Sequence, residues 1–288
     1  MNMIAFYTFC AILTKNHLKR VCTMFEERID PLIYDISHKL VSSPLQTQYH
    51  SHMHNYCELL LFVSGDAEYM IDGQLYRLQR YDLLLIPSTA YHRLLPKSAA
   101  PYENYVIDFS ASLITPEHYK KIFTPPYIVN IREDRQMRRY FSLLDFYHEH
   151  YSPEDFCKCA MNVIHEILIY CSYQSKSPLL AQSSESPVDR MLQFIAENIE
   201  KPLDAAVIAD HMALSKSYVQ NSFCQVMHTG LKQYIMEKKI LCAHNDLVNG
   251  MQPGQVAEKY SFSEYSVFFR QYKKVFGCSP RTARGTLM

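Results

Sequence analysis

The chain has 288 residues, enough for two domains of ordinary size, and 48% of them are hydrophobic while 20% are charged. This composition allows a buried core and excludes a chain that is disordered overall. Lysine plus arginine and aspartate plus glutamate each number 29, so a net charge of zero neither indicates nor excludes a nucleic-acid partner.

The cysteines and the amino terminus bear on where the protein works. Nine cysteines without regular spacing are typical of free thiols in a reducing cytoplasm. The apolar opening from Met3 to Leu13 is too short to cross a membrane, and its basic residues follow rather than precede it. Met24 is a second candidate start. We therefore expect a cytoplasmic protein that does not act at a membrane.

Short strands separated by tight turns are predicted from about Phe25 to Phe109. The pair Asp72-Gly73 suits the type I′ turn of a hairpin, because both positions of that turn need a positive φ. Many short strands with tight turns favour a barrel or a sandwich. The clearest segments are Cys57–Val63, Glu68–Leu78, Leu83–Ile86 and Tyr102–Phe109.

Three histidines and a glutamate accompany these strands: His52, His54, Glu58 and His92. In an extended segment His52 and His54 point to the same side. With Glu58 and a returning His92 they could form a metal site of three nitrogens and one oxygen.

The spacing of these residues resembles the two motifs of the cupin fold, a small β-barrel. The first motif is intact through Gly65, whereas Tyr81 and Thr89 stand where the second usually has glycine. Cupin-like sensor domains often hold such polar groups at the barrel mouth without metal, and barrel mouths commonly bind small ligands. We therefore favour an organic ligand over a metal, with no cofactor. The ligand-binding residues would be Tyr49, His52, His54, Glu58, Tyr91 and His92.

Two helices are predicted next, Glu133–Tyr147 and Pro153–Tyr173. Ser152 can cap the second helix, in whose first turn Pro153 is tolerated. Apolar residues of that helix repeat at three- and four-residue spacing, and this stripe would pack on its own domain or form the seam of a homodimer. The stripe consists of Phe156, Ala160, Val163, Ile164, Ile167, Leu168 and Cys171.

The last hundred residues contain one motif twice, at a separation of about 48 residues. In each copy a helix with a small alanine, Ala209 or Ala257, is followed by a tight turn and a second helix, as in a helix-turn-helix. The two second helices are predicted at Lys216–Met227 and Glu264–Val275, and a long helix, Leu231–Val248, joins the copies.

The second helix of the later copy has an apolar face, with Phe268 and Tyr272, and a basic face, with Arg270 and Lys273. Five basic residues and no acidic one follow Phe269. A solvated surface helix would show the same pattern, but two such helices on one rigid connector suit successive major grooves of DNA, about 34 Å apart.

From residue 188 to Arg284 the pattern resembles the AraC/XylS family of bacterial transcriptional regulators. The matching motifs are Val256-Ala257, Ser261-Phe262, Phe268-Phe269-Arg270, Tyr272-Lys273-Lys274, Gly277 and Ser279-Pro280. The resemblance implies that Ser217, Gln220, Asn221, Tyr265, Ser266, Phe269 and Arg270 face bases and that Lys273 faces phosphate. Lys216 and Ser263, at the starts of the two helices, complete the predicted DNA-binding set.

Three departures from the family pattern concern the two motifs. Cys224 stands where the first motif usually has lysine, and Asn221 where arginine is common. Ser261 replaces a usual turn glycine in the second motif. The first unit therefore has a nearly uncharged reading face, and we expect it to contribute less electrostatic affinity than the second.

These observations predict an α+β protein of two domains: a cupin-like β-barrel with flanking helices, then an all-α pair of helix-turn-helix motifs joined by a long helix. The expected ranges are a sensing and dimerising domain at 24–173, a linker at 174–186 and a DNA-binding domain at 187–288. We expect a homodimeric transcriptional regulator of promoter DNA, with RNA polymerase as a further partner.

A small molecule, such as a sugar or a related metabolite, would modulate this regulator from the amino-terminal barrel. The alternative is a metal-dependent cupin enzyme using His52, His54, Glu58 and His92, which leaves the duplicated motif unexplained. Because no catalytic motif stands out, we expect a protein that is not an enzyme.

Overall fold

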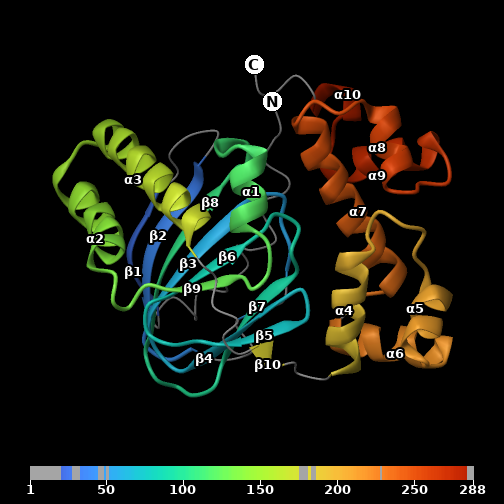
Figure 1. The fold of residues 1–288 in the computed structure, drawn as a ribbon, viewed down its shortest axis with the longest axis horizontal. Helices are drawn as coiled ribbons and strands as arrows, with labels where there is room; N and C mark the ends of the chain where they lie inside the picture. Colours follow the sequence, from blue (N-terminus) through green and yellow to red (C-terminus); the bar gives the residue numbers. More distant parts are fainter. Residues whose placement is uncertain are drawn as a thin grey trace.

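The computed structural model describes residues 21–27, 33–44, 49, 52–174, 181–182, 186–227 and 229–283. A β-rich amino-terminal region is followed by an all-helical carboxy-terminal region, which confirms the predicted fold class (Figure 1). The strands of the described residues form two sheets rather than one closed barrel, in the orders β1-β2-β8-β3-β6-β9 and β10-β5-β4-β7. The strands are β1 Val21–Glu27, β2 Ile33–Val41, β3 Cys57–Ser64, β4 Ala67–Ile71, β5 Gln74–Arg77, β6 Asp82–Ile86, β7 His92–Pro96, β8 Tyr102–Phe109, β9 Ile128–Asn130 and β10 Ala181–Gln182.

Strand β3 is central because it pairs antiparallel with both β6 and β8. Its side chains alternate between two cores, as the period of a strand requires. Leu59 and Leu61 pack toward the helices on the outer face of the six-stranded sheet. Leu60 and Phe62 pack into the interior between the two sheets. The buried apolar run predicted here is confirmed, as is the hairpin turn, where φ is 44° at Asp72 and 84° at Gly73.

After β8 come a short 3₁₀ helix and three α-helices, with β9 between the first and second α-helices: η4 Ala111–Leu113, α1 Pro116–Ile122, α2 Arg135–His150 and α3 Pro153–Tyr173. The Ser152 hydroxyl caps α3 by accepting the backbone N–H of Asp155 at 3.2 Å. All seven residues of the apolar stripe on α3 are buried in the core beneath the helices. The stripe therefore packs on its own domain, and it is not available as a dimer seam.

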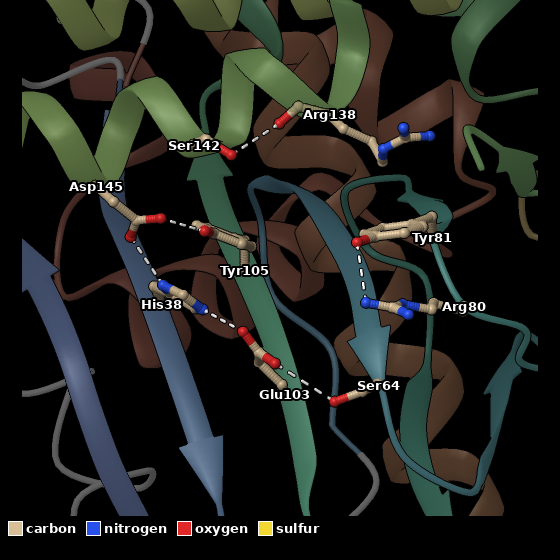
Figure 2. A network of polar contacts seen from close by, with 9 residues as sticks. All are labelled: His38, Ser64, Arg80, Tyr81, Glu103, Tyr105, Arg138, Ser142 and Asp145. Carbon is tan, nitrogen blue, oxygen red and sulfur yellow. Dashed lines mark hydrogen bonds and ion pairs between the residues drawn. The ribbon is translucent and has the colours of Figure 1, made fainter. Parts of the chain in front are cut away.

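A buried histidine ties α2 to the six-stranded sheet (Figure 2). Nδ1 of His38 on β2 lies 2.8 Å from Asp145 of α2, and its Nε2 lies 3.0 Å from Glu103 of β8. Burial alone lowers the pKa of His38, but the two carboxylates outweigh it and raise the pKa above its ordinary value. The ring also stacks on Tyr105, at 3.9 Å between centroids. These contacts fix the position of α2 on the sheet.

The two positions where cupins usually have glycine adopt the left-handed backbone that glycine favours. The φ angle is 65° at Tyr81 and 70° at Thr89. The Tyr81 ring lies under the guanidinium groups of Arg80 and Arg138, at 4.8 and 5.1 Å from its centroid, and these cation–π contacts offset part of the backbone strain. The departure from the motif therefore changes the residue type and preserves the backbone conformation.

The carboxy-terminal region consists of two helix-turn-helix units, α5–α6 and α8–α9, on either side of α7 (Figure 1). Helix α7 contributes Tyr234 and Ile235 to the core of the first unit. It contributes Ala243 and Leu247 to the core of the second. The helices are α4 Pro187–Glu197, α5 Ala205–Met212, α6 Lys216–Met227, α7 Leu231–Val248, α8 Pro253–Lys259, α9 Tyr265–Phe276 and α10 Pro280–Ala283.

Helix α3 ends at Tyr173 and α4 begins at Pro187. Most of the predicted linker between them lies outside the described residues, so the domain boundaries stay predictions. Within that segment β10 pairs with β5. No helix in the described part of the chain is both long and apolar enough to cross a membrane.

Candidate nucleic-acid interface and effector site

Helices α6 and α9 each bury one face and expose the other. Val219 and Phe223 of α6, and Phe268 and Tyr272 of α9, are fully buried. The residues predicted to bind DNA lie on the other faces or at the helix starts, and all are exposed except the half-buried Phe269. The exposed residues are Lys216, Ser217, Gln220, Asn221, Ser263, Tyr265, Ser266, Arg270 and Lys273.

The two exposed faces differ in charge. On α9, Arg270, Lys273 and Lys274 are exposed, and none of them forms an ion pair with another described residue. On α6, Lys216 is the only basic residue. The Ser266 hydroxyl donates to the Glu264 carboxylate at 2.9 Å. Unpaired cations on a short exposed helix suit contacts with phosphate, so α9 offers the stronger electrostatic surface.

Helix α7 positions the two recognition helices by different contacts. Phe223 of α6 packs on Tyr234, with 5.2 Å between ring centroids. On the other side, the Tyr272 hydroxyl of α9 lies 2.6 Å from Nδ1 of His244. Burial lowers the pKa of His244 to about 4, so the ring is neutral at neutral pH. The first unit is held by aromatic packing and the second by a polar contact as well.

The structure brings His52, His54, Glu58 and His92 together at one end of the amino-terminal region. One potential ligand atom from each lies within 4.8 Å of the others. His52 is exposed and exchanges backbone hydrogen bonds with His92, at 3.1 and 2.9 Å. The side chains of His54 and Glu58 are 9% and 8% exposed, and that of His92 is fully buried. We call these four residues the Glu58 site.

Hydrogen bonds define which ring nitrogens carry protons in this site. Nδ1 of His54 lies 2.9 Å from the Tyr56 carbonyl, and Nδ1 of His92 lies 2.9 Å from the Ala90 carbonyl. A carbonyl oxygen only accepts, so each Nδ1 carries the proton. The Nε2 atoms therefore face the Glu58 carboxylate, at 3.2 Å from His54 and 3.4 Å from His92.

This arrangement brings hydrogen-bond acceptors together. Burial lowers the pKa of His54, which favours the neutral ring with a lone pair on Nε2. Nε2 of His92 has no hydrogen-bond partner within the described residues, since its contact with Glu58 is long. Lone pairs facing a carboxylate favour an occupant that carries positive charge or donates hydrogen bonds.

The resemblance to cupins makes a metal ion one possible occupant, and the donor set fits one. His52, His54 and His92 would supply nitrogen and Glu58 oxygen, as transition metals of the zinc type prefer. The bonds from His54 and His92 to backbone carbonyls are the outer contacts that orient metal-binding imidazoles. When bound, the ion would supply positive charge to the buried carboxylate.

The two tyrosines predicted in the same site lie elsewhere. Tyr49 is half-buried against the interior core between the sheets, where burial raises its pKa to about 12. Tyr91 packs into the core of α4–α7, with its ring edge-to-face on Tyr234 at 5.5 Å. The placement of Tyr91 in the Glu58 site is therefore wrong. Neighbours in an extended segment point to opposite sides, and Tyr91 points away because His92 points in.

Sequence reasoning missed two polar groups of the interior. Asp108 of β8 is paired in register with Glu58, and burial raises its pKa well above the ordinary value. Oδ1 of Asp108 and the hydroxyl of Tyr102 have no hydrogen-bond partner in the described part of the chain. The period of two along the predicted strand 102–109 would have placed both on one face, beside the site. They extend the polar lining around Glu58.

Comparisons with known proteins match both regions of the chain. Residues 43–184 match the AraC-like ligand-binding domain, and residues 208–286 match a helix-turn-helix domain. The virulence regulon transcriptional activator VirF of Yersinia enterocolitica is 29% identical over 128 residues, which cover 43% of this chain and 47% of VirF. The regulatory protein SoxS of Salmonella typhimurium is 27% identical over 106 residues, which cover 36% of this chain and 99% of SoxS.

Among solved structures, ToxT of Vibrio cholerae aligns over 93% of this chain and 98% of its own, with 14% sequence identity and a TM-score of 0.36. A similarity at this level does not establish a common arrangement of the two regions. The matched part spans about half the length of VirF. The two domain matches together cover well over half of the chain, in the order that the sequence motifs predict. The chain belongs to the AraC family of transcriptional regulators.

Proposed function

We propose that this protein is a DNA-binding transcriptional regulator whose activity is modulated by a small molecule in its amino-terminal domain. The observation that carries the proposal is the pair of exposed recognition faces, α6 and α9, attached to one continuous helix, α7. A rigid connector sets the distance between two reading helices, as successive major grooves on one side of DNA require.

The residues on the two faces divide between base and phosphate contacts. Arg270 has the planar fork that pairs with guanine, whereas Gln220 and Asn221 carry the amides that pair with adenine. Lys273 would contact phosphate, which positions the protein without reading sequence. The other proposed contacts are those of Lys216, Ser217, Ser263, Tyr265, Ser266 and Phe269.

The proposed effector site is the Glu58 site. The unpartnered Nε2 of His92 and the unpartnered groups of Tyr102 and Asp108 support a polar occupant, because buried polar atoms without partners are costly. A sugar or a related polar metabolite meets this requirement through its hydroxyl groups. A divalent metal ion is a second candidate, favoured by the three imidazoles and the carboxylate.

We further propose that the protein acts in the cytoplasm as a homodimer at promoters, where it meets RNA polymerase. Nine cysteines without a disulfide framework support the reducing compartment. VirF is a transcriptional activator and SoxS a regulatory protein, which supports a regulator rather than a cupin enzyme.

The test is a DNA-binding assay with the full chain on duplexes that it selects from a random pool. Lys273→Ala should weaken binding and lower the slope of log affinity against log salt by about one, because one phosphate contact is lost. Arg270→Ala should cost about 1–3 kcal/mol and relax the sequence preference at one position.

Two matched lysines serve as controls. Lys216→Ala, on the weakly charged face of α6, should have a smaller effect than Lys273→Ala. Lys121→Ala removes an exposed lysine of α1 that is paired with Glu117 at 2.8 Å, and it should leave DNA binding unchanged. The proposal would be overturned if the chain retained no DNA at low salt. It would also be overturned if Lys273→Ala, Lys216→Ala and Lys121→Ala lost DNA affinity equally.

A further inference from the structure

The loop that carries His92 also contacts α7, and so forms part of the interface between the two regions of the molecule. Residues 87–92 have the Glu58 site on one side and α7 on the other. The Asn245 side chain of α7 donates to the Ser88 hydroxyl at 2.7 Å. The Thr89 hydroxyl lies 3.2 Å from the Cys242 sulfur, one helical turn before Asn245. One face of α7 is therefore docked on this loop.

Lys238 is the centre of this contact. Its side chain is 3% exposed, and its ammonium group lies 2.7 Å from a carboxylate oxygen of Asp72, in the turn between β4 and β5. It also donates to the Thr89 carbonyl at 2.9 Å. The same oxygen of Asp72 accepts the backbone N–H of Tyr91 at 3.0 Å. A buried ammonium group is tolerated only with such partners, so it depends on the docking of the two regions.

The backbone next to this ion pair is also closely packed. A side chain at Gly73 would collide with the backbone of Asp189, in the first turn of α4. The hairpin turn therefore touches the DNA-binding region at two points, α4 and α7.

Thr89 joins the Glu58 site to Lys238 through its own peptide groups. Its N–H donates to the carbonyl of His54 at 2.7 Å, and its carbonyl accepts from Lys238. Its φ of 70° is one that β-branched residues avoid, so the surrounding contacts hold it in place. Thr89 is therefore a single residue that connects the backbone of His54 to the ammonium group of Lys238.

We infer that the Asp72–Lys238 ion pair is a latch between the two regions, and that the occupant of the Glu58 site controls it. This inference rests on the proposed function, because it assigns the route of regulation for that site. An occupant that moves His54 or His92 moves Thr89 and the loop. Lys238 then loses its partners and leaves the interface, and α7 undocks together with both helix-turn-helix units.

The experiment measures hydrogen–deuterium exchange of α7 in the full chain. Lys238→Met keeps the length of the side chain and removes its charge. It should raise the opening equilibrium of α7 by about a hundredfold or more, since removing one partner of a buried pair costs about 3 kcal/mol at least. Asp72→Asn, made on the other side of the interface, should act in the same direction while keeping the oxygen that accepts from Tyr91.

Lys239→Met is the matched control. Lys239 is the next residue of α7 and is also buried, but it donates to the carbonyls of Lys201 and Tyr260, inside the DNA-binding region. Its substitution should leave exchange in loop 87–92 unchanged, whereas Lys238→Met should raise it. Equal exchange of the loop in the two variants would overturn the latch.

Control by the Glu58 site is tested by a double-mutant cycle. Glu58→Gln should raise exchange in α7 of the wild-type chain, and it should add nothing in the Lys238→Met background. His52→Ala, at the exposed rim of the site, is a second perturbation that leaves the core strands intact. If the effects of Glu58→Gln and of His52→Ala on exchange in α7 each add to the effect of Lys238→Met, the site and the latch are independent and the inference fails.

The outcomes separate this inference from the proposed function. If the cycle is non-additive but the chain binds no DNA, the latch stands and the proposed function is wrong. If DNA binding responds to Lys273→Ala as expected but the cycle is additive, the proposed function stands and the latch is wrong.

Discussion

The two helix-turn-helix units have the same architecture but different surroundings. The core of the first unit continues into the amino-terminal region, because Tyr91 and Met53 pack against it. The core of the second is built from α7–α10 and Ile199. The second unit carries the unpaired cations of α9, whereas the face of α6 has Lys216 alone. The first unit is thus tied to the amino-terminal region, and the second has the more positively charged exposed face.

The two copies of the motif therefore differ in role although they share a fold. Both units use a small alanine where their helices cross, Ala209 and Ala257, and both alanines are buried. The features that the two units share build the helix-turn-helix fold. The features that differ are the packing against the amino-terminal region and the charge of the exposed helix face. Substitutions of matched residues can therefore separate the contribution of each unit.

The largest effect is expected from opening a cavity in either core. Phe223 of α6 and Phe268 of α9 are each fully buried in the core of their own unit. Replacing either by alanine should lower the free energy of unfolding of its unit by about 3–5 kcal/mol, as measured by urea denaturation. Only Phe223→Ala should also raise hydrogen exchange in residues 87–92, because Phe223 packs on Tyr234, which contacts Tyr91. Equal exchange of that loop in both variants would contradict the division between the units.

An intermediate effect on the free energy of unfolding is expected when the pH is lowered, because the second unit contains the polar contact between His244 and Tyr272. The pKa of His244 is about 4 in the folded chain, below the ordinary 6.5, so the unfolded chain takes up the proton first as pH falls. The stability that His244 contributes is complete above pH 6.5 and is lost as pH falls toward 4. The loss is at most roughly 3 kcal/mol.

The measurement is the free energy of unfolding at several pH values, for the wild type and for His244→Asn, whose side-chain oxygen can replace Nδ1 as a partner of Tyr272. The variant should lose less stability between pH 6.5 and 4 than the wild type. His38 does not confuse the result: its pKa is raised, so its contribution is complete below pH 6.5 and is lost at higher pH. Parallel curves for the two proteins would exclude His244 as a source of acid sensitivity.

Local patterns predicted many elements of both regions with little error. The observed bounds of α3, α6, α7 and β8 are those predicted, because their periodicity, caps and flanking turns are encoded by neighbouring residues. The grouping of His52, His54, Glu58 and His92 was also predicted, since a strand and its returning neighbour bring them to one place. The spacing of residues along the sequence was sufficient to predict a contact wherever the residues in contact belong to one local motif.

Contacts between the regions could not be predicted in the same way. Lys238 and Asp72 are 166 residues apart, and a lysine on an amphipathic helix is normally solvated. Its burial follows from the docking of α7 on the amino-terminal region, which no local pattern specifies. Tyr91 was misplaced for the same reason, because the partner that attracts it, Tyr234, belongs to α7. The missed features are those that depend on two distant segments.

The smallest effect is expected at the turns of the two units. Ala213 and Ser261 occupy corresponding positions with φ of 54° and 53°. A left-handed conformation costs an L-residue about 1–2 kcal/mol, and glycine loses about 0.5–1 kcal/mol more entropy on folding. Ala213→Gly should therefore raise the free energy of unfolding by roughly 0.5 kcal/mol.

Ser261→Gly should give no such gain. The Ser261 hydroxyl donates to the Glu200 carbonyl at 2.6 Å, and the loss of that bond costs about 0.5–1.5 kcal/mol. Urea denaturation of the two variants beside the wild type measures the difference. Equal stabilisation would mean that the hydroxyl contributes nothing. A gain confined to Ala213→Gly would mean that the bond to Glu200, which follows α4, retains serine in a glycine position and links the turn of the second unit to the first.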